Sequence, residues 1–308
     1  MSDPLDACVR ALLGRFRRQR PLRSGSLLMT ILGDAIAPRG GRVTLGSLIR
    51  LAAPLGLPER LVRTSVARLA QDGWLAARRS GRRSEYALTE PGRRRFAAAT
   101  RRIYGARPHS WRRRWTLIML VPSPPASRAR RREELHWLGF GQIAPDVFGH
   151  PGLGSAEVRA RLAAAGIGNH MTLLEAQTEA ARDDRRLVRS GWDLAELARA
   201  YQRFVKGFAP LAAALRAGAV PTPEIAFVAR SLLIHEYRRI HLRDPALPDV
   251  LLPGDWVGTT AYELCRQLYR ALFHSAERYL SLHARTLGGA LPAASRAARA
   301  RFRSDSRG

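Results

Sequence analysis

Arginines fall on one face of a predicted helix, opposite the face that can pack in a core. In the segment 58–72, Arg60, Arg63 and Thr64 lie on one side of a helical wheel and the apolar side chains on the other. A guanidinium can donate two hydrogen bonds to O6 and N7 of guanine, and the DNA major groove admits one α-helix. This spacing therefore predicts a helix that reads double-stranded DNA, although any one of these arginines could simply solvate a helix face.

A second group of arginines flanks a predicted hairpin turn. Ser80-Gly81 is a turn signal between two predicted strands, residues 74–79 and 82–88. Arginines beside such a turn can reach DNA phosphates or a narrow minor groove, and Arg68 at the flank of the helix suits a phosphate. The predicted DNA contacts are Arg60, Arg63, Thr64, Arg68, Arg78, Arg79, Arg82 and Arg83.

Three helices and the hairpin must position these side chains. Apolar spacing predicts a first helix from Ser24 to Ile36 and a short second helix at residues 45–53. Pro58 is suited to start the third helix, because a proline in the first turn loses no hydrogen bond. With a fourth helix reaching about Tyr104, this order predicts a winged helix-turn-helix DNA-binding domain over residues 24–104.

The distribution of charge also indicates a polyanionic partner. The 308 residues carry a formal net charge of +27, and residues 1–104 hold 21 arginines against 7 acidic residues. This first third of the chain therefore carries about half of the excess positive charge. Residues 1–23 are predicted to be a basic extension containing an amphipathic helix, and residues 105–114 a basic linker.

The rest of the chain has a different pattern, and the predicted fold class is α+β and multidomain. Residues 115–190 form a predicted βαβ-type α+β module that resembles a ferredoxin-like fold. Its predicted strands are residues 115–121, 143–149 and 170–176. Residues 191–287 are almost entirely helical. Residues 288–308 are rich in Ala, Arg and Ser without apolar periodicity, which predicts a disordered tail.

Composition and motifs argue against several function classes. No apolar run approaches the roughly 20 residues of a membrane span, and no apolar signal core is found, so we expect a cytoplasmic protein without membrane contact. Two cysteines, Cys8 and Cys265, exclude a disulfide scaffold and a cysteine-rich zinc module. Phosphate-loop, nucleophile-elbow and His-Glu-x-x-His motifs are not found. We therefore expect no catalytic residues, metal ligands or cofactor.

A series of motifs runs along the chain in a recognisable order. The motifs are Ser26-Leu-Leu-Met-Thr-Ile-Leu-Gly-Asp34, Pro38-Arg-Gly-Gly41, Glu59-Arg-Leu-Val-Arg-Thr-Ser-Val-Ala-Arg-Leu69, Gly73-Trp74, Tyr86-Ala-Leu-Thr89, Trp115-Thr-Leu117, Trp137-Leu-Gly-Phe-Gly141, His235-Glu-Tyr-Arg-Arg239 and Arg243-Asp-Pro245. Over roughly residues 24–285 the chain thereby resembles the PaaX family of transcriptional repressors. The resemblance implies an N-terminal winged helix, a central Cas2-like ferredoxin domain and a C-terminal helical domain for effector binding and dimerisation.

The resemblance also implies a function and partners. Family members are similar in repressing phenylacetic acid catabolic genes and in being released from DNA by phenylacetyl-CoA. We therefore expect a homodimer on a palindromic double-stranded operator, with phenylacetyl-CoA or a related acyl-CoA as the effector. Which acyl group this member recognises stays open.

The C-terminal half contains groups that an acyl-CoA would need. Arginines suit its phosphates, an aromatic or apolar face suits its adenine, and a dry pocket suits an aryl-acyl end. The predicted effector contacts are Trp192, His235, Tyr237, Arg238, Arg239 and Trp256. The alternative is that the aromatic residues pack in a core and the arginines solvate a helix face.

Two other functions stay open at the level of sequence. A metal-dependent nuclease built on the Cas2-like domain would need a carboxylate at the end of its first strand, but Trp115–Val121 has none and runs into Pro122. A non-specific nucleic-acid-binding or docking protein would bind any polyanion with a steep salt dependence.

Overall fold

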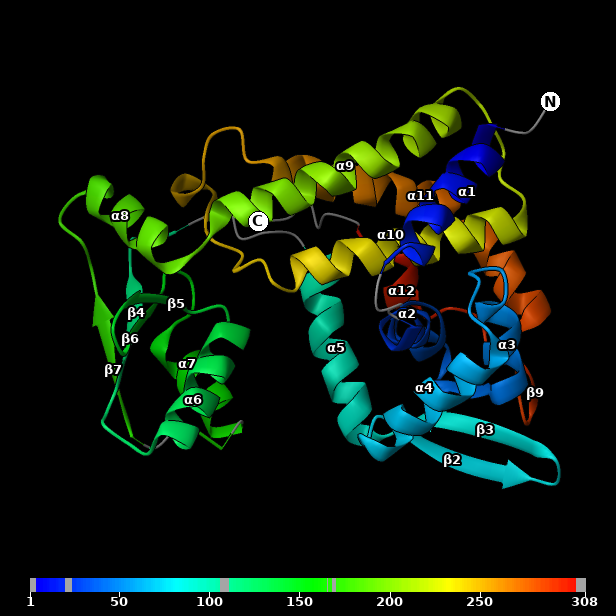
Figure 1. Cartoon of the computed structure of the whole chain (residues 1–308), viewed down its shortest axis with the longest axis horizontal. Helices are drawn as coiled ribbons and strands as arrows, with labels where there is room; N and C mark the ends of the chain where they lie inside the picture. The colour runs from blue at the N-terminus through cyan, green and yellow to red at the C-terminus, as the bar shows by residue number, and fades with distance from the viewer. Residues whose placement is uncertain (1–3, 20–23, 106–110, 165, 168–169, 303–308) are drawn as a thin grey trace. The chain divides into compact units, whose positions relative to one another are not determined.

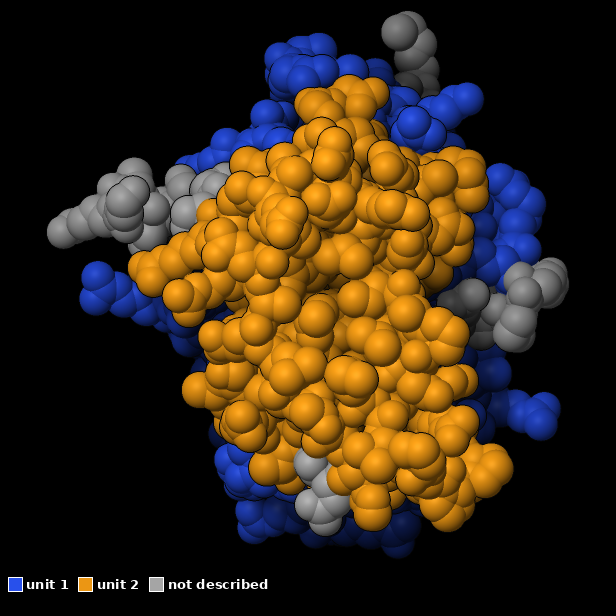
Figure 2. Space-filling model, turned by 90° about the vertical axis from the view of Figure 1, so that its left-hand side faces the viewer, with its two compact units in different colours: residues 1–105, 202–241, 259–308 blue, residues 106–201, 242–258 orange. Residues whose placement is uncertain are grey.

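The chain forms two compact units. The computed structural model describes residues 4–19, 24–105, 111–164, 166–167 and 170–302 (Figure 1). The first unit contains residues 1–105, 202–241 and 259–308, and the second contains residues 106–201 and 242–258; Figure 2 colours them separately. The predicted helical segment 191–287 is therefore divided between the two units. None of the described helices is long and apolar enough to cross a membrane.

The N-terminal extension begins with helix α1 (Pro4–Arg17), which packs on helix α10 (Pro223–His241). Its buried side chains recur every three or four residues and are Leu5, Val9, Leu12 and Phe16. The Phe16 ring meets the His235 ring of α10 edge-on, with centroids 5.4 Å apart. The predicted amphipathic helix is confirmed, and it belongs to the core of the first unit.

Four helices and a three-stranded sheet follow. They are α2 (Ser24–Ile31), β1 (Arg42–Thr44), α3 (Leu45–Ala52), α4 (Glu59–Gln71), β2 (Leu75–Ser80), β3 (Arg83–Leu88) and α5 (Glu90–Tyr104). The antiparallel sheet has the order β1-β3-β2. Ser80 pairs with Arg83, so the hairpin turn lies at Gly81-Arg82, one residue later than predicted. Gly81 has a φ of 55°, which glycine adopts without a Cβ clash.

The predicted helix from Ser24 to Ile36 changes its winding after Ile31. A π-helical turn, η1 (Leu32–Ile36), and a 3-10 turn, η2 (Ala37–Arg39), follow α2. The π-helical turn carries Asp34, which is buried. Periodicity alone does not distinguish this wider turn from a continuous α-helix.

The second unit contains a four-stranded antiparallel sheet with the order β5-β6-β4-β7. Its elements are β4 (Trp115–Leu120), α6 (Pro125–Trp137), β5 (Gly141–Ala144), β6 (Val147–His150), α7 (Ser155–Ala164) and β7 (Met171–Ala176), followed by α8 (Ala181–Gly191). This βαββαβ order is that of a ferredoxin-like fold. The single strand predicted at residues 143–149 is wrong, because the chain turns at Pro145-Asp146 and forms the hairpin β5–β6.

The C-terminal half is mostly helical, as predicted. It contains α9 (Leu194–Arg216), α10, the 3-10 turn η3 (Asp249–Leu251) and α11 (Val257–His283). Helix α10 is buried on nearly all sides from Ala226 to His235, so it needs cover from several elements. Helices α1, α2 and α5 supply part of that cover, which explains why α10 joins the N-terminal elements in one unit.

The predicted disordered tail is wrong for residues 288–302. Beyond α11 the chain forms the small hairpin β8 (Arg285–Thr286) and β9 (Gly289–Ala290) and the short helix α12 (Arg296–Arg299). Ala298, Arg301 and Phe302 are buried, so individual anchoring side chains order a segment that has no apolar periodicity. Residues 303–308 lie outside the described residues.

Candidate nucleic-acid interface

Helix α4 buries one face and exposes the other. Val62, Val66 and Leu69 are buried, and α4 packs against α2 and α3. Arg60, Arg63, Thr64 and Arg68 are all exposed, as the helical wheel predicts. Thr64 donates its hydroxyl to the carbonyl of Arg60 over 2.9 Å, which leaves its methyl group and a lone pair for a partner.

Acidic residues at the two ends of the same helix, Glu59 and the C-terminal cap Asp72, pair with two of these arginines. Nε of Arg63 donates to Oε1 of Glu59 over 2.8 Å, and Nε of Arg68 lies 4.0 Å from Oδ2 of Asp72. Exposed pairs of this kind contribute only about 0–1 kcal/mol, so a phosphate or a base edge can replace the carboxylate at little cost.

The hairpin β2–β3 presents the second predicted group. Arg78, Arg79, Arg82 and Arg83 are exposed, and Leu75 is the one buried side chain of β2. Figure 1 shows this hairpin as a long arm beside α4. The structure thus brings all eight predicted DNA contacts onto two adjacent elements of the first unit, α4 and the hairpin.

Two features of this surface were missed by the sequence reasoning. Glu85 on β3 is 3% exposed and accepts a hydrogen bond from the backbone N–H of Leu287 over 2.7 Å, which anchors the β2–β3 hairpin to the β8–β9 hairpin. Arg93 and Arg94 on α5 are also exposed and pair with Glu90. Only the charge count of residues 1–104 carried a signal for these two arginines.

The predicted effector contacts on α10 make internal contacts. His235 and Tyr237 are fully buried, with Nδ1 of His235 lying 3.3 Å from Oγ1 of Thr30. Arg238 donates to Oγ1 of Thr30 over 2.7 Å and to Oγ of Ser26 over 2.8 Å. Burial lowers the pKa of Arg238 to about 10.

The remaining predicted effector contacts are also engaged. Arg239 donates to Glu236 over 3.4 Å. In the second unit, Nε1 of Trp192 donates to the carbonyl of Gly139 over 3.1 Å, and Trp256 packs edge-on against Tyr201. The structure therefore brings the four α10 residues together as packing between α10 and its neighbours and places the two tryptophans in the other unit.

Comparison with known proteins identifies the family. Family models match three consecutive regions: PaaX-like protein at residues 23–92, PaaX protein central Cas2-like domain at 108–188 and PaaX-like protein C-terminal domain at 192–282. The chain belongs to the PaaX family. The chain is 38% identical over 277 residues to Transcriptional repressor PaaX of Escherichia coli (strain K12), covering 89% of this chain and 88% of that protein.

A solved structure shares the fold. Uncharacterized protein Rv0674 from Mycobacterium tuberculosis is similar with a TM-score of 0.52 and 22% identity, covering 76% of this chain and 89% of that one. The family models and the relative from Escherichia coli confirm the resemblance to the PaaX family drawn from sequence motifs, and the central module is Cas2-like.

In the Cas2-like domain, a buried carboxylate that contacts the first strand has a structural role. Asp184 on α8 is buried and accepts hydrogen bonds from Nε1 of Trp115 over 2.8 Å and from Oγ1 of Thr178 over 2.5 Å. Arg113 lies 3.3 Å from the same carboxylate. Among the described residues, no group of three His, Cys, Asp or Glu could hold a metal ion.

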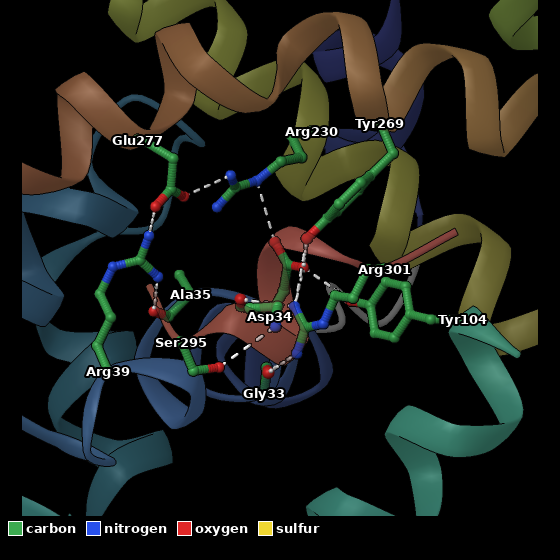
Figure 3. A network of polar contacts seen from close by, with 11 residues as sticks. Gly33, Asp34, Ala35, Arg39, Tyr104, Arg230, Tyr269, Glu277, Ser295 and Arg301 are labelled. Atoms are coloured by element: carbon green, nitrogen blue, oxygen red, sulfur yellow. Dashed lines mark hydrogen bonds and ion pairs between the residues drawn. The ribbon is translucent and has the colours of Figure 1, made fainter. Parts of the chain in front are cut away.

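A buried charged network, the Asp34 network, lies within the first unit (Figure 3). Asp34 pairs with Arg230 of α10 at 3.1 Å and with Arg301 at 2.8 Å, and it accepts hydrogen bonds from the hydroxyls of Tyr104 and Tyr269 at 2.7 and 3.0 Å. Burial raises the pKa of Asp34, but the two guanidiniums and the two hydroxyls outweigh this effect and hold the pKa below its usual value. The network thus joins the π-helical turn after α2 to helices α10 and α11.

The Asp34 network extends through a second acid. Arg230 donates to Oε1 of Glu277 on α11 over 2.8 Å, and Arg39 pairs with the same carboxylate. Burial and the charge of Arg230 lower the pKa of Arg39 to about 10, although Asp34 opposes that shift. Asp34 ends a family motif in the sequence, but nothing in the sequence indicates its partners.

Proposed function

We propose that this chain is a transcriptional repressor that binds double-stranded DNA through a winged helix-turn-helix at residues 24–104. One observation carries the proposal: α4 exposes Arg60, Arg63 and Thr64 opposite its buried face, next to a hairpin with four exposed arginines. Helix α4 would enter the major groove, and the hairpin arginines would contact phosphates or the minor groove. The name of the 38% identical relative supports the repressor role.

The proposal includes regulation by a small molecule. From the family resemblance, the repressor acts as a cytoplasmic homodimer on a palindromic operator of phenylacetic acid catabolic genes, and phenylacetyl-CoA or a related acyl-CoA releases it. An effector that binds the DNA-incompetent state more tightly shifts the population away from DNA, by no more than its differential affinity. A coupling of about 1–3 kcal/mol weakens DNA binding about 5–150-fold.

A titration of the DNA upstream of the protein's own gene tests both parts. Salt is held fixed, and a scrambled duplex of equal length and composition is run in parallel. Tight binding to the upstream fragment, relieved by phenylacetyl-CoA but not by free CoA or phenylacetate, supports the repressor and its effector. Equal binding to both duplexes contradicts sequence-specific repression and favours non-specific binding.

A further inference from the structure

The C-terminal segment, residues 295–302, places a phenylalanine ring in a cage of tyrosines. Phe302 is the last described residue and is 1% exposed. The rings around it belong to Tyr104, Tyr237, Tyr262 and Tyr269, with centroids at 5.1, 6.5, 5.6 and 5.3 Å. These tyrosines come from α5, α10 and α11, so helices from the N-terminal and the C-terminal parts of the first unit build the cage together. The cage is shaped for a benzyl group, and the chain itself supplies one.

The backbone at Phe302 is in an uncommon conformation. Its φ is 57°, in the left-handed region that bulky L-residues rarely adopt. Such a conformation persists only where the surrounding contacts hold it. Leaving the cage would relieve this strain, and of the described elements only the short helix α12 (Arg296–Arg299) would move with Phe302.

The charges around the cage also permit the segment to leave. Arg301 donates to the carboxylate and the carbonyl of Asp34 and to the carbonyl of Gly33. The other charged side chains of the network in Figure 3 are Asp34, Glu277, Arg39 and Arg230, two acids and two bases. Without Arg301 these four balance, so removal of the segment would leave no unpaired charge buried in the network.

We propose that the tyrosine cage is a binding site for the aryl end of an aryl-acyl ligand, which displaces Phe302 and releases the C-terminal segment. A phenylacetyl group has the ring and methylene of a phenylalanine side chain, with a carbonyl in place of the Cα atom, so it can occupy the same space. The identity of the acyl ligand rests on the proposed function.

Release of the segment would remove contacts with the proposed DNA-binding region. Arg301 holds the π-helical turn after α2, and the N–H of Ser295 donates to the carbonyl of Pro38 over 3.0 Å. Glu85 of the arginine hairpin is held by Leu287, a few residues earlier in the same C-terminal part of the chain. Displacement therefore frees the turn that follows α2, and α2 is the helix against which α4 packs.

Calorimetric titration of the full-length protein in the absence of DNA tests the site. Phe302→Ala removes the competing ring, so phenylacetyl-CoA should bind this variant about tenfold more tightly or better than the wild type, because the closed state no longer reduces its apparent affinity. Acetyl-CoA, which lacks the ring, should show no such gain. Phe140→Ala, which removes an equally buried ring from the second unit, should leave the affinity unchanged.

Trypsin cleavage after Arg301 gives a second readout on the unmodified chain. Phenylacetyl-CoA should accelerate this cleavage about tenfold, because Arg301 is buried until the segment leaves. Equal affinity of the wild type and Phe302→Ala overturns the proposal, as does cleavage that ignores phenylacetyl-CoA. If Phe302→Ala does not fold, a chain that ends at residue 300 replaces it. Because no DNA is present, a failure here is separate from a failure of operator binding.

Discussion

Asp34 and Arg301 lie 267 residues apart in the chain, and their side chains form a buried ion pair at 2.8 Å. Asp34 belongs to the turn after α2, and Arg301 to the C-terminal segment. The ion pair therefore links the N-terminal and the C-terminal parts of the first unit. Arg230, Tyr104 and Tyr269 contact the same carboxylate. The charge of Asp34 therefore stabilises contacts with α5, α10, α11 and the C-terminal segment.

Asp34→Asn should destabilise the first unit strongly at neutral pH. The substitution leaves the buried Arg301 without its carboxylate and leaves Arg230 with Glu277 as its carboxylate partner. Breaking a buried pair in this way costs about 3–5 kcal/mol. Urea unfolding at pH 7, followed by tyrosine fluorescence and circular dichroism, measures the loss. Asp72→Asn on the surface is the matched control, and it should cost less than about 1 kcal/mol.

The stability that Asp34 provides should also depend on pH. Its pKa in the folded chain is below the ordinary value of 3.8, so its contribution is complete above that value and is lost as the pH falls through the folded pKa. The stability difference between wild type and Asp34→Asn should therefore be constant from pH 7 to about pH 5 and shrink below about pH 4. A difference that already shrinks between pH 7 and 5 would contradict the lowered pKa.

Much of the fold could be predicted because its signals are local. Apolar periodicity predicts a helix at residues 58–72, and the structure has it at Glu59–Gln71. The turn residues predict the hairpin to within one residue, since short-range patterns specify both elements. The β5–β6 hairpin was missed because its turn, at Pro145-Asp146, interrupts a short apolar run without glycine. The order of tail residues such as Phe302 was missed because it depends on contacts with residues far away in the sequence. Such contacts leave no periodic pattern.

The candidate site residues also divide into those with a local sequence signal and those without one. The exposed arginines of α4 and the hairpin follow from helix and strand geometry, so the sequence predicted where they lie. Residues such as Tyr237 and Arg238 have the right chemistry for an acyl-CoA, but the sequence does not show that α1, α2 and α5 pack around their helix. Composition cannot distinguish a buried arginine with partners from one that lines a pocket.

Arg63→Ala should weaken binding to the operator more than binding to a scrambled duplex. A bidentate contact to a base edge contributes about 1–3 kcal/mol of discrimination, which a phosphate contact does not. Fluorescence anisotropy at fixed salt measures both affinities. Arg189→Ala, an exposed arginine of α8 in the second unit, is the control and should change neither. An equal loss on both duplexes would assign Arg63 to a phosphate instead.

Arg79→Ala and Arg82→Ala in the hairpin should weaken binding to every duplex by a similar factor. Both side chains are exposed and would contact phosphates, so each lost contact releases fewer counterions. The slope of log K against log salt should fall by about 0.9 for each substitution. Titrations at four salt concentrations give this slope, and an unchanged slope would show that these arginines do not touch the DNA backbone.

Glu85→Ala should loosen the arginine hairpin without removing an arginine. The buried Glu85 carboxylate accepts the N–H of Leu287, and hydrogen bonds to charged groups contribute about 1.5–3 kcal/mol. We expect a stability loss in that range, faster hydrogen exchange at the Leu287 amide and weaker DNA binding, because the β2–β3 hairpin loses its attachment to the β8–β9 hairpin. Glu90→Ala, which removes an exposed acid paired with Arg93, is the control and should leave Leu287 exchange unchanged. Unchanged exchange in Glu85→Ala as well would contradict this role of Glu85 and leave the pairing of β1 with β3 as the attachment of the hairpin.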